Sequence, residues 1–164
     1  MPLPPVVILA CGNPSRGDDA LGPLLLERLQ SWLDASATGA GCELLGDFQL
    51  QIEHALDLVG RRLLLFIDAG QQTPAPFVFR QAQAADGVAH STHALTPEAL
   101  LAVLLRIDHE PPPPAFVLCV RGESFALGED LSAAAASHAD AAFELLEALL
   151  RRPELDYWQS LLSR

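Results

Sequence analysis

Two carboxylates and one imidazole stand where the sequence changes from one predicted element to the next. Asp19 follows the apolar run Val6 to Cys11 through a Gly-Asn-Pro turn, Asp68 ends a second apolar run, and His93 precedes a predicted helix. Carboxylate oxygens and an imidazole nitrogen together suit a divalent ion of Ni, Co, Zn or Mn. If the fold brings the three side chains together, they predict a site for such an ion.

Each of these residues also has a simpler interpretation. Asp19 could cap the helix that follows it, because Asp is a common N-cap residue. Asp18 stands directly before Asp19, however, and capping needs only one carboxylate. Asp68 at the end of a buried strand would be desolvated unless it has a partner or a function. His93 alone could be a surface histidine in a loop.

Alternating apolar runs predict five strands and four helices. The strands are expected at Val6–Cys11, Cys42–Gly46, Leu63–Asp68, Phe77–Ala82 and Phe116–Arg121, and the helices at Asp19–Leu33, Leu50–Val59, Pro97–Ile107 and Leu131–Leu150. The tail from Pro153 to Arg164 carries apolar residues at helical spacing and is expected to pack on the body. This order predicts the α/β class, as a three-layer α/β/α sandwich around an open, twisted, mostly parallel five-stranded sheet.

Chain reach places the three candidate side chains at one edge of that sheet. The strand at Phe77 follows Asp68 after too few residues for a parallel crossover, so it is expected to be an antiparallel edge strand. The next segment, Gln83 to Leu95, is long enough to return to the carboxyl ends of the parallel strands, which places His93 there. Ligands of such sheets bind at that edge.

Composition limits the classes of partner. The 164 residues fit a single domain spanning 1–164, and half of them are hydrophobic, which is enough for a core. The formal net charge of -11 disfavours nucleic acid and anionic membranes. Without a signal-like or membrane-spanning segment, we expect a cytoplasmic protein, and the acidic surface favours a monomer. Cys11, Cys42 and Cys119 are expected to be buried thiols rather than disulfide or zinc ligands.

Three short motifs resemble those of the hydrogenase maturation proteases. The block from Gly12 to Gly22 is similar to the family's Gly-Asn, four residues, Asp-Asp/Glu, two residues, Gly signature. Asp68 in Phe-Ile-Asp-Ala matches the family's second acidic position, and His93 in Ser-Thr-His-Ala-Leu matches its histidine. The resemblance extends over about Val6 to Leu150.

The resemblance implies an endopeptidase that removes the C-terminal extension of a nickel-loaded nickel-iron hydrogenase large-subunit precursor. It implies that Asp19, Asp68 and His93 contact the metal and carry catalysis, and that Asp18 is a cap or supporting residue. The nickel would belong to the substrate, so no tightly bound cofactor of the protein's own is expected. The same three side chains could instead serve a non-catalytic nickel-binding or checkpoint protein for the precursor.

The sequence departs from the commoner family pattern after the second strand. Many relatives have an Asp-Gly-Gly-Thr-type turn there, whereas this chain has Gly46-Asp-Phe-Gln-Leu-Gln-Ile-Glu-His54. The turn is expected at the same edge as the site and is the best candidate for choosing the precursor. We therefore expect Asp47, Gln49, Gln51 and Glu53 to bind substrate. The variant resembles members that serve soluble, NAD-linked hydrogenases.

Overall fold

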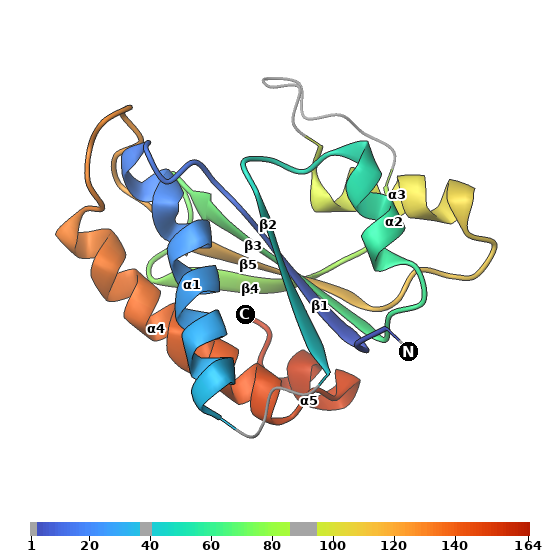
Figure 1. The fold of residues 1–164 in the computed structure, drawn as a ribbon. Coiled ribbons are helices and arrows are strands. Elements are labelled where there is room, and N and C mark those ends of the chain that lie inside the picture. The colour runs from blue at the N-terminus through green and yellow to red at the C-terminus, as the bar shows by residue number, and fades with distance from the viewer. Residues whose placement is uncertain (1–2, 37–40, 86–94) are drawn as a thin grey trace.

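The computed structural model describes residues 3–36, 41–85 and 95–164, which build one five-stranded sheet with helices on both faces (Figure 1). The strand order is β2-β1-β3-β5-β4. The strands are β1 (Val6–Cys11), β2 (Cys42–Asp47), β3 (Leu63–Gly70), β4 (Phe77–Ala82) and β5 (Ala115–Arg121). The first three neighbouring pairs are parallel, and β4 pairs antiparallel with β5 at the edge. The predicted fold class and the antiparallel edge strand are confirmed.

The helices form two layers. On one face lie α1 (Leu21–Ala35), α4 (Ala133–Arg151) and α5 (Leu155–Ser160), and on the other lie α2 (Ala55–Leu58) and α3 (Pro97–Ile107). Short 3-10 helices, η1 (Gly17–Ala20) and η2 (Ile52–His54), precede α1 and α2. None of the helices within the described ranges is long and apolar enough to cross a membrane.

Strand residues alternate between the two cores, as the period of a β-strand requires. Ile8, Leu65 and Phe116 pack toward α1, α4 and α5. Their sequence neighbours Leu9, Phe66 and Val117 pack toward α2 and α3. This alternation continues to the strand ends, where it places Cys11, Asp68 and Cys119 on the α2 and α3 side.

Two of the predicted helices begin differently from the expectation. The helix expected at Asp19–Leu33 is the 3-10 turn η1 followed by α1, whose N-cap is Ala20. The helix expected at Leu50–Val59 is only the turn η2 and the four-residue α2. The turn η2 begins with a capping box, in which Nδ1 of His54 accepts a hydrogen bond from the backbone N–H of Gln51.

Candidate functional site

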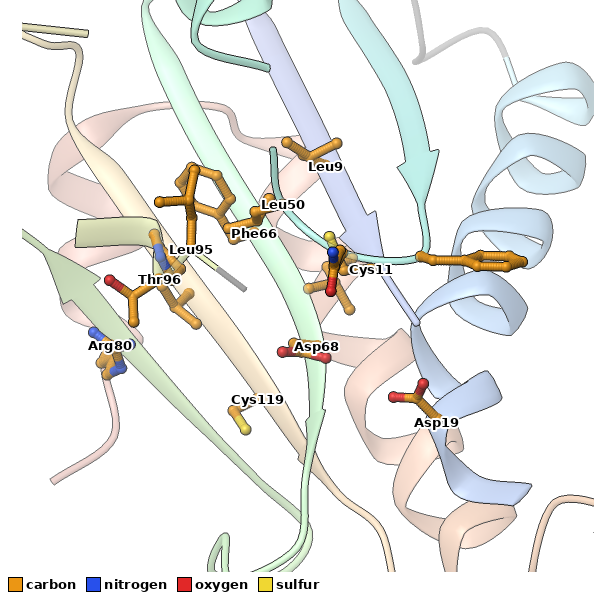
Figure 2. A pocket seen from close by; sticks show the side chains of 15 residues that line it. Leu9, Cys11, Asp19, Leu50, Phe66, Asp68, Arg80, Leu95, Thr96 and Cys119 are labelled. Atoms are coloured by element: carbon orange, nitrogen blue, oxygen red, sulfur yellow. The ribbon is translucent and has the colours of Figure 1, made fainter. Parts of the chain in front are cut away.

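A pocket of about 460 Å³ opens at the carboxyl edge of the sheet, on the face covered by α2 and α3. Its floor is made by residues of β1, β3 and β5, and its sides by the turn after β2 and the first residues of α3. Figure 2 shows Asp68 near the centre of this pocket, with Asp19 on one side and Cys119 on the other. Two of the three predicted site residues therefore line the same cavity.

Strand register brings the floor of the pocket together. Cys11 in β1 pairs with Asp47 in β2, and Asp68 in β3 pairs with Cys119 in β5. Because Ala10 pairs with Ile67, Cys11 comes level with Asp68. Side chains that are level on neighbouring parallel strands point to the same face, so Cys11, Asp68 and Cys119 form a row across the floor of the pocket.

Asp68 is exposed to solvent at the mouth of the strand, yet its surroundings disfavour its charge. Its Oδ1 accepts a hydrogen bond of 2.8 Å from the backbone N–H of Ala69. Desolvation by the pocket walls and the nearby negative charge of Asp19 outweigh that bond and raise the pKa of the Asp68 carboxyl to about 6. At neutral pH the carboxylate is mostly ionised and remains able to take up a proton.

Asp19 does not cap the helix. Its Oδ2 accepts a hydrogen bond of 2.7 Å from the backbone N–H of Asn13, in the turn that follows β1. The cap position of α1 is Ala20, whose side chain makes no capping bond. Asp19 is therefore held by the turn and lines the pocket, so the capping interpretation is wrong.

The neighbouring acid, Asp18, has a structural role. It is fully buried and its carboxylate accepts hydrogen bonds from the backbone N–H groups of Glu123, Ser124 and Ser132, at 2.6, 3.1 and 2.7 Å, and from the Ser132 hydroxyl at 2.7 Å. Burial alone would raise the pKa of Asp18, but the bonds from Ser132, Glu123 and Ser124 lower it overall. The two adjacent carboxylates thus have different roles. Asp18 links η1 to the loop before α4, whereas Asp19 faces the pocket.

The close approach of β1 to α1 explains the glycines of this block. Gly12 has φ +150°, and a Cβ built on it would lie 2.0 Å from the carbonyl oxygen of Asp19. A Cβ on Gly22 would lie 2.2 Å from the carbonyl oxygen of Cys11. Only glycine permits backbone contacts this close. The two glycines of the motif therefore allow the segment around Asp19 to pack directly against the end of β1.

The thiols on the pocket floor are poor nucleophiles. Burial, followed by the negative charges of Asp68, Asp47 and Asp19, raises the pKa of Cys11 to about 12. Burial also raises the pKa of Cys119, whose Sγ lies 3.1 Å from the Thr73 hydroxyl. The expectation of a buried thiol is confirmed for Cys11, whereas Cys42 and Cys119 are only half-buried.

The four predicted substrate-binding residues are dispersed. Gln49 lines the pocket. Asp47 lies at the end of β2, where its Oδ1 accepts a bond of 2.7 Å from the N–H of Phe48 and its Oδ2 lies 3.2 Å from Nε2 of His54. Gln51 and Glu53 are exposed and do not line the pocket. Gln51 instead forms a capping box with His54 at the start of η2.

His93 lies outside the described residues, so its predicted place stays a prediction. Leu95 and Thr96, which follow it in the chain, line the pocket. Within the described part of the chain, no cluster of three or more His, Cys, Asp or Glu side chains is arranged to hold a metal ion. Asp19 and Asp68 alone are an incomplete ligand set.

Sequence reasoning missed two side chains of the pocket. Phe48, with 65% of its surface exposed, stands at the rim. Arg80 in β4 also lines the cavity and forms an ion pair with Glu98 in the first turn of α3, at 2.6 Å. The alternation of β4 could have found Arg80, because it shares a face with Ala82 of the second core.

Comparison with known proteins gives the fold. No protein-family model matches the sequence, and no curated protein matches it. Among solved structures, the NiFe hydrogenase maturation protease HycI from Thermococcus kodakarensis KOD1 is similar with a TM-score of 0.68 and 23% identity, over 91% of this chain and 94% of that one. The chain has the fold of the solved maturation proteases.

Two further structures agree with this result. The hydrogenase maturating endopeptidase HybD from E. coli has a TM-score of 0.68 and 23% identity, over 90% of this chain and 93% of its own. An endopeptidase from E. coli solved in solution has a TM-score of 0.69 and 23% identity, with the same coverage of both chains. The fold implied by the sequence motifs is therefore confirmed over nearly the whole chain.

Proposed function

We propose that this chain is a hydrogenase maturation protease, which removes the C-terminal extension of a nickel-loaded nickel-iron hydrogenase large-subunit precursor. The observation that carries the proposal is the meeting of Asp19 and Asp68 in one pocket at the carboxyl edge of the sheet. These are the two carboxylates that the motif resemblance assigns to metal contact. The fold shared with solved maturation endopeptidases supports the same conclusion.

The carboxylates suit a nickel ion that arrives with the substrate. One oxygen of each is held by a backbone N–H, from Asn13 for Asp19 and from Ala69 for Asp68. Across the described residues, the other oxygen of each accepts no hydrogen bond, so it is available as a ligand. We assign the third contact to His93, which is joined through two peptide bonds to Leu95 in the pocket wall. An incomplete set of protein ligands leaves room for substrate atoms.

Within this proposal the protein positions the precursor and handles a proton. Nickel in the precursor supplies a Lewis acid that polarises the scissile carbonyl or a water. Asp19 fixes the position of the loaded segment through Oδ1, the oxygen that does not accept the bond from Asn13. Asp68 is the better candidate for the general base when its carboxylate is not coordinated to the metal, because a carboxyl with a pKa of about 6 combines an ionised form at neutral pH with useful basicity. The inert thiols of the pocket disfavour a cysteine mechanism.

The test is a mass-spectrometric cleavage assay on nickel-loaded and nickel-free precursor. The precursors tested include the large subunit of a soluble, NAD-linked hydrogenase. The turn after β2 resembles that of family members that serve such hydrogenases. We expect release of one C-terminal peptide from the loaded precursor only, and no release by the His93→Ala variant. His109→Ala is the matched control, because His109 is exposed just after α3, and it should process normally.

Three results would contradict the proposal. A stable complex with the loaded precursor and no shortened product would favour the non-catalytic checkpoint protein. Equal cutting of loaded and nickel-free precursor would remove the metal from the mechanism. Hydrolysis of small esters or amides without any precursor would indicate an unrelated hydrolase on the same fold.

A further inference from the structure

A second cavity meets the candidate site at the end of β2. It has a volume of about 470 Å³ and lies on the opposite face of the sheet, between α1 and the ends of β1 and β2. Asp47 lies on its lining, and Phe48 lines both cavities. Neither the proposed metal contacts nor the proposed base uses this second cavity.

The second cavity is built to accept an aliphatic group. Pro23 and Leu26 from α1 and Leu44 from β2 form apolar walls, while the exposed side chains of Glu27 and Gln30 stand at the rim. In pockets of this kind the apolar walls bind an apolar group, and the few polar groups fix its orientation. Its chemistry differs from that of the first pocket, which carries two carboxylates.

The space in this cavity depends on a glycine. A Cβ built on Gly46 would lie 2.9 Å from Cδ2 of Leu26 and would enter the cavity that both residues line. Gly46 is exposed and its φ is not in the left-handed region, so the backbone does not demand glycine here. The glycine keeps the cavity open.

A polypeptide is the ligand that both cavities fit together. β2 is an outermost strand of the sheet, so a chain leaving the first pocket can pass over its end. Phe48 stands at this crossing with 65% of its surface exposed, and a large exposed aromatic beside a reactive site is typical of a binding surface. The continuity of the two cavities through Phe48 connects the second one to the substrate of the first.

We propose that the second cavity is a specificity subsite that receives an aliphatic side chain of the polypeptide substrate, with Phe48 packing against the chain between subsite and reactive carboxylates. This inference rests on the proposed function, because it takes the protein to cut a polypeptide at Asp19 and Asp68. It adds that the substrate must carry an aliphatic side chain close to the scissile bond.

The first test narrows the cavity and measures steady-state cleavage of the nickel-loaded precursor. Gly46→Val should raise KM about tenfold and leave kcat within about twofold, because the lost contact is equal in the ground and transition states. Leu26→Phe narrows the same space from the other wall and should act alike. Ser31→Val is the matched control, since Ser31 lies on α1 beside a different cavity, and it should leave KM unchanged. Thermal unfolding checks that all variants fold.

The second test changes the substrate. Apolar residues on both sides of the scissile bond are replaced by Ala one at a time, and one replacement should raise KM for the wild type but add nothing to the effect of Gly46→Val. Such non-additivity identifies the residue that occupies the subsite. Unchanged KM in both folded narrowing variants, or additive effects at every position, would overturn the subsite alone. A wild-type protein that never cuts the precursor would overturn the proposed function and the subsite with it.

Discussion

Adjacent residues of the same chemical type have different environments in this protein. Asp18 accepts four hydrogen bonds inside the fold, whereas Asp19 accepts one from the described residues and lines a pocket. Asp68 is open to solvent but stands near Asp19, and the pKa values of Asp18 and Asp68 move in opposite directions. Hydrogen bonds to a carboxylate favour its charge, while poor solvation and a like charge disfavour it. These residues therefore give two opposite predictions.

Asp68→Asn should abolish processing and leave the protein as stable as the wild type or more stable. The folded-state pKa of about 6 lies above the ordinary value of 3.8, so the folded state binds more protons than the unfolded state between these two pH values. The contribution of Asp68 to the free energy of unfolding then falls as pH rises from about 4 to about 6 and is constant above that. Because Asp68 is exposed, we expect the gain in Asp68→Asn to be at most about 1 kcal/mol.

The measurement for Asp68 is urea denaturation of wild type and Asp68→Asn at pH 4 and pH 7.5. The difference in unfolding free energy should favour the variant at pH 7.5 and vanish at pH 4. A variant that is less stable at pH 7.5 by more than about 1 kcal/mol would make Asp68 a structural residue. Normal processing by this variant would remove Asp68 from the site.

Asp18→Ala should destabilise the fold by about 3 kcal/mol, because it leaves the partly buried N–H donors of Glu123, Ser124 and Ser132 without their acceptor. The lowered pKa of Asp18 means that its contribution is present above the ordinary pKa and is lost as pH falls through the folded-state value. Chemical denaturation at pH 7 measures the loss. Asp140→Ala is the control, since Asp140 is an exposed partner of Arg28 and should change stability by less than about 0.5 kcal/mol.

At the level of elements, strands were easier to predict than the starts of helices. Continuous apolar runs identified the three central strands β1, β3 and β5, because buried parallel strands need little else, and shorter apolar runs identified the outer strands β2 and β4. The turn after β2 was not predictable, because its shape depends on local contacts. There the Nδ1 of His54 accepts a hydrogen bond from Gln51 and its Nε2 lies near Asp47, and the chain forms the turn η2 before the short α2 where one longer helix was expected. For the same reason the sequence left two roles open for Asp19, helix cap or site residue. Only the hydrogen bond from Asn13 in the folded chain decides between them.

Gly22→Ala tests the contact between α1 and β1 that holds Asp19 in place. The new Cβ would lie 2.2 Å from the backbone carbonyl oxygen of Cys11, so the helix must move away from the strand. We expect a loss of about 2 to 3 kcal/mol, as for overpacking of a core, and weaker processing of precursor. Thermal unfolding and the cleavage assay check the two effects. Ser31→Ala on the exposed face of α1 should change neither, and an equally stable Gly22→Ala would contradict the close packing.

On the scale of the whole molecule, the site and the C-terminal tail lie on different faces of the sheet. The pocket belongs to the α2 and α3 side, whereas α5 packs with α1 and α4 (Figure 1). The tail was expected to pack on the body, and it does. Ser163 donates its N–H to the carbonyl oxygen of Phe79 and accepts from the N–H of Phe79 through its hydroxyl, at 2.8 Å each. These bonds cover the outer edge of β4, which leaves β2 as the edge beside the site.

Trp158 is the large buried side chain by which the tail enters the core. Its removal tests whether packing on that face of the sheet affects the site on the other face. Trp158 is fully buried, its ring meets Phe116 edge-on at 5.3 Å, and its indole N–H donates to the carbonyl oxygen of Leu149 at 2.9 Å. Trp158→Ala should cost about 4 kcal/mol, since it removes a large aromatic from a packed core. Leu155→Ala in the same helix is half-exposed and should cost less than about 1 kcal/mol.

The expected pattern for Trp158→Ala is a large drop in Tm with unchanged KM and kcat for precursor at a temperature where the variant remains folded. The reason is geometric, since the pocket floor is formed by the opposite faces of β1, β3 and β5 and contains no residue of α4 or α5. Cleavage kinetics at low temperature together with a thermal scan measure both quantities. If KM rises or kcat falls as stability is lost, while Leu155→Ala leaves both unchanged, the two faces are coupled through β5. The tail would then help to shape the site as well as complete the core.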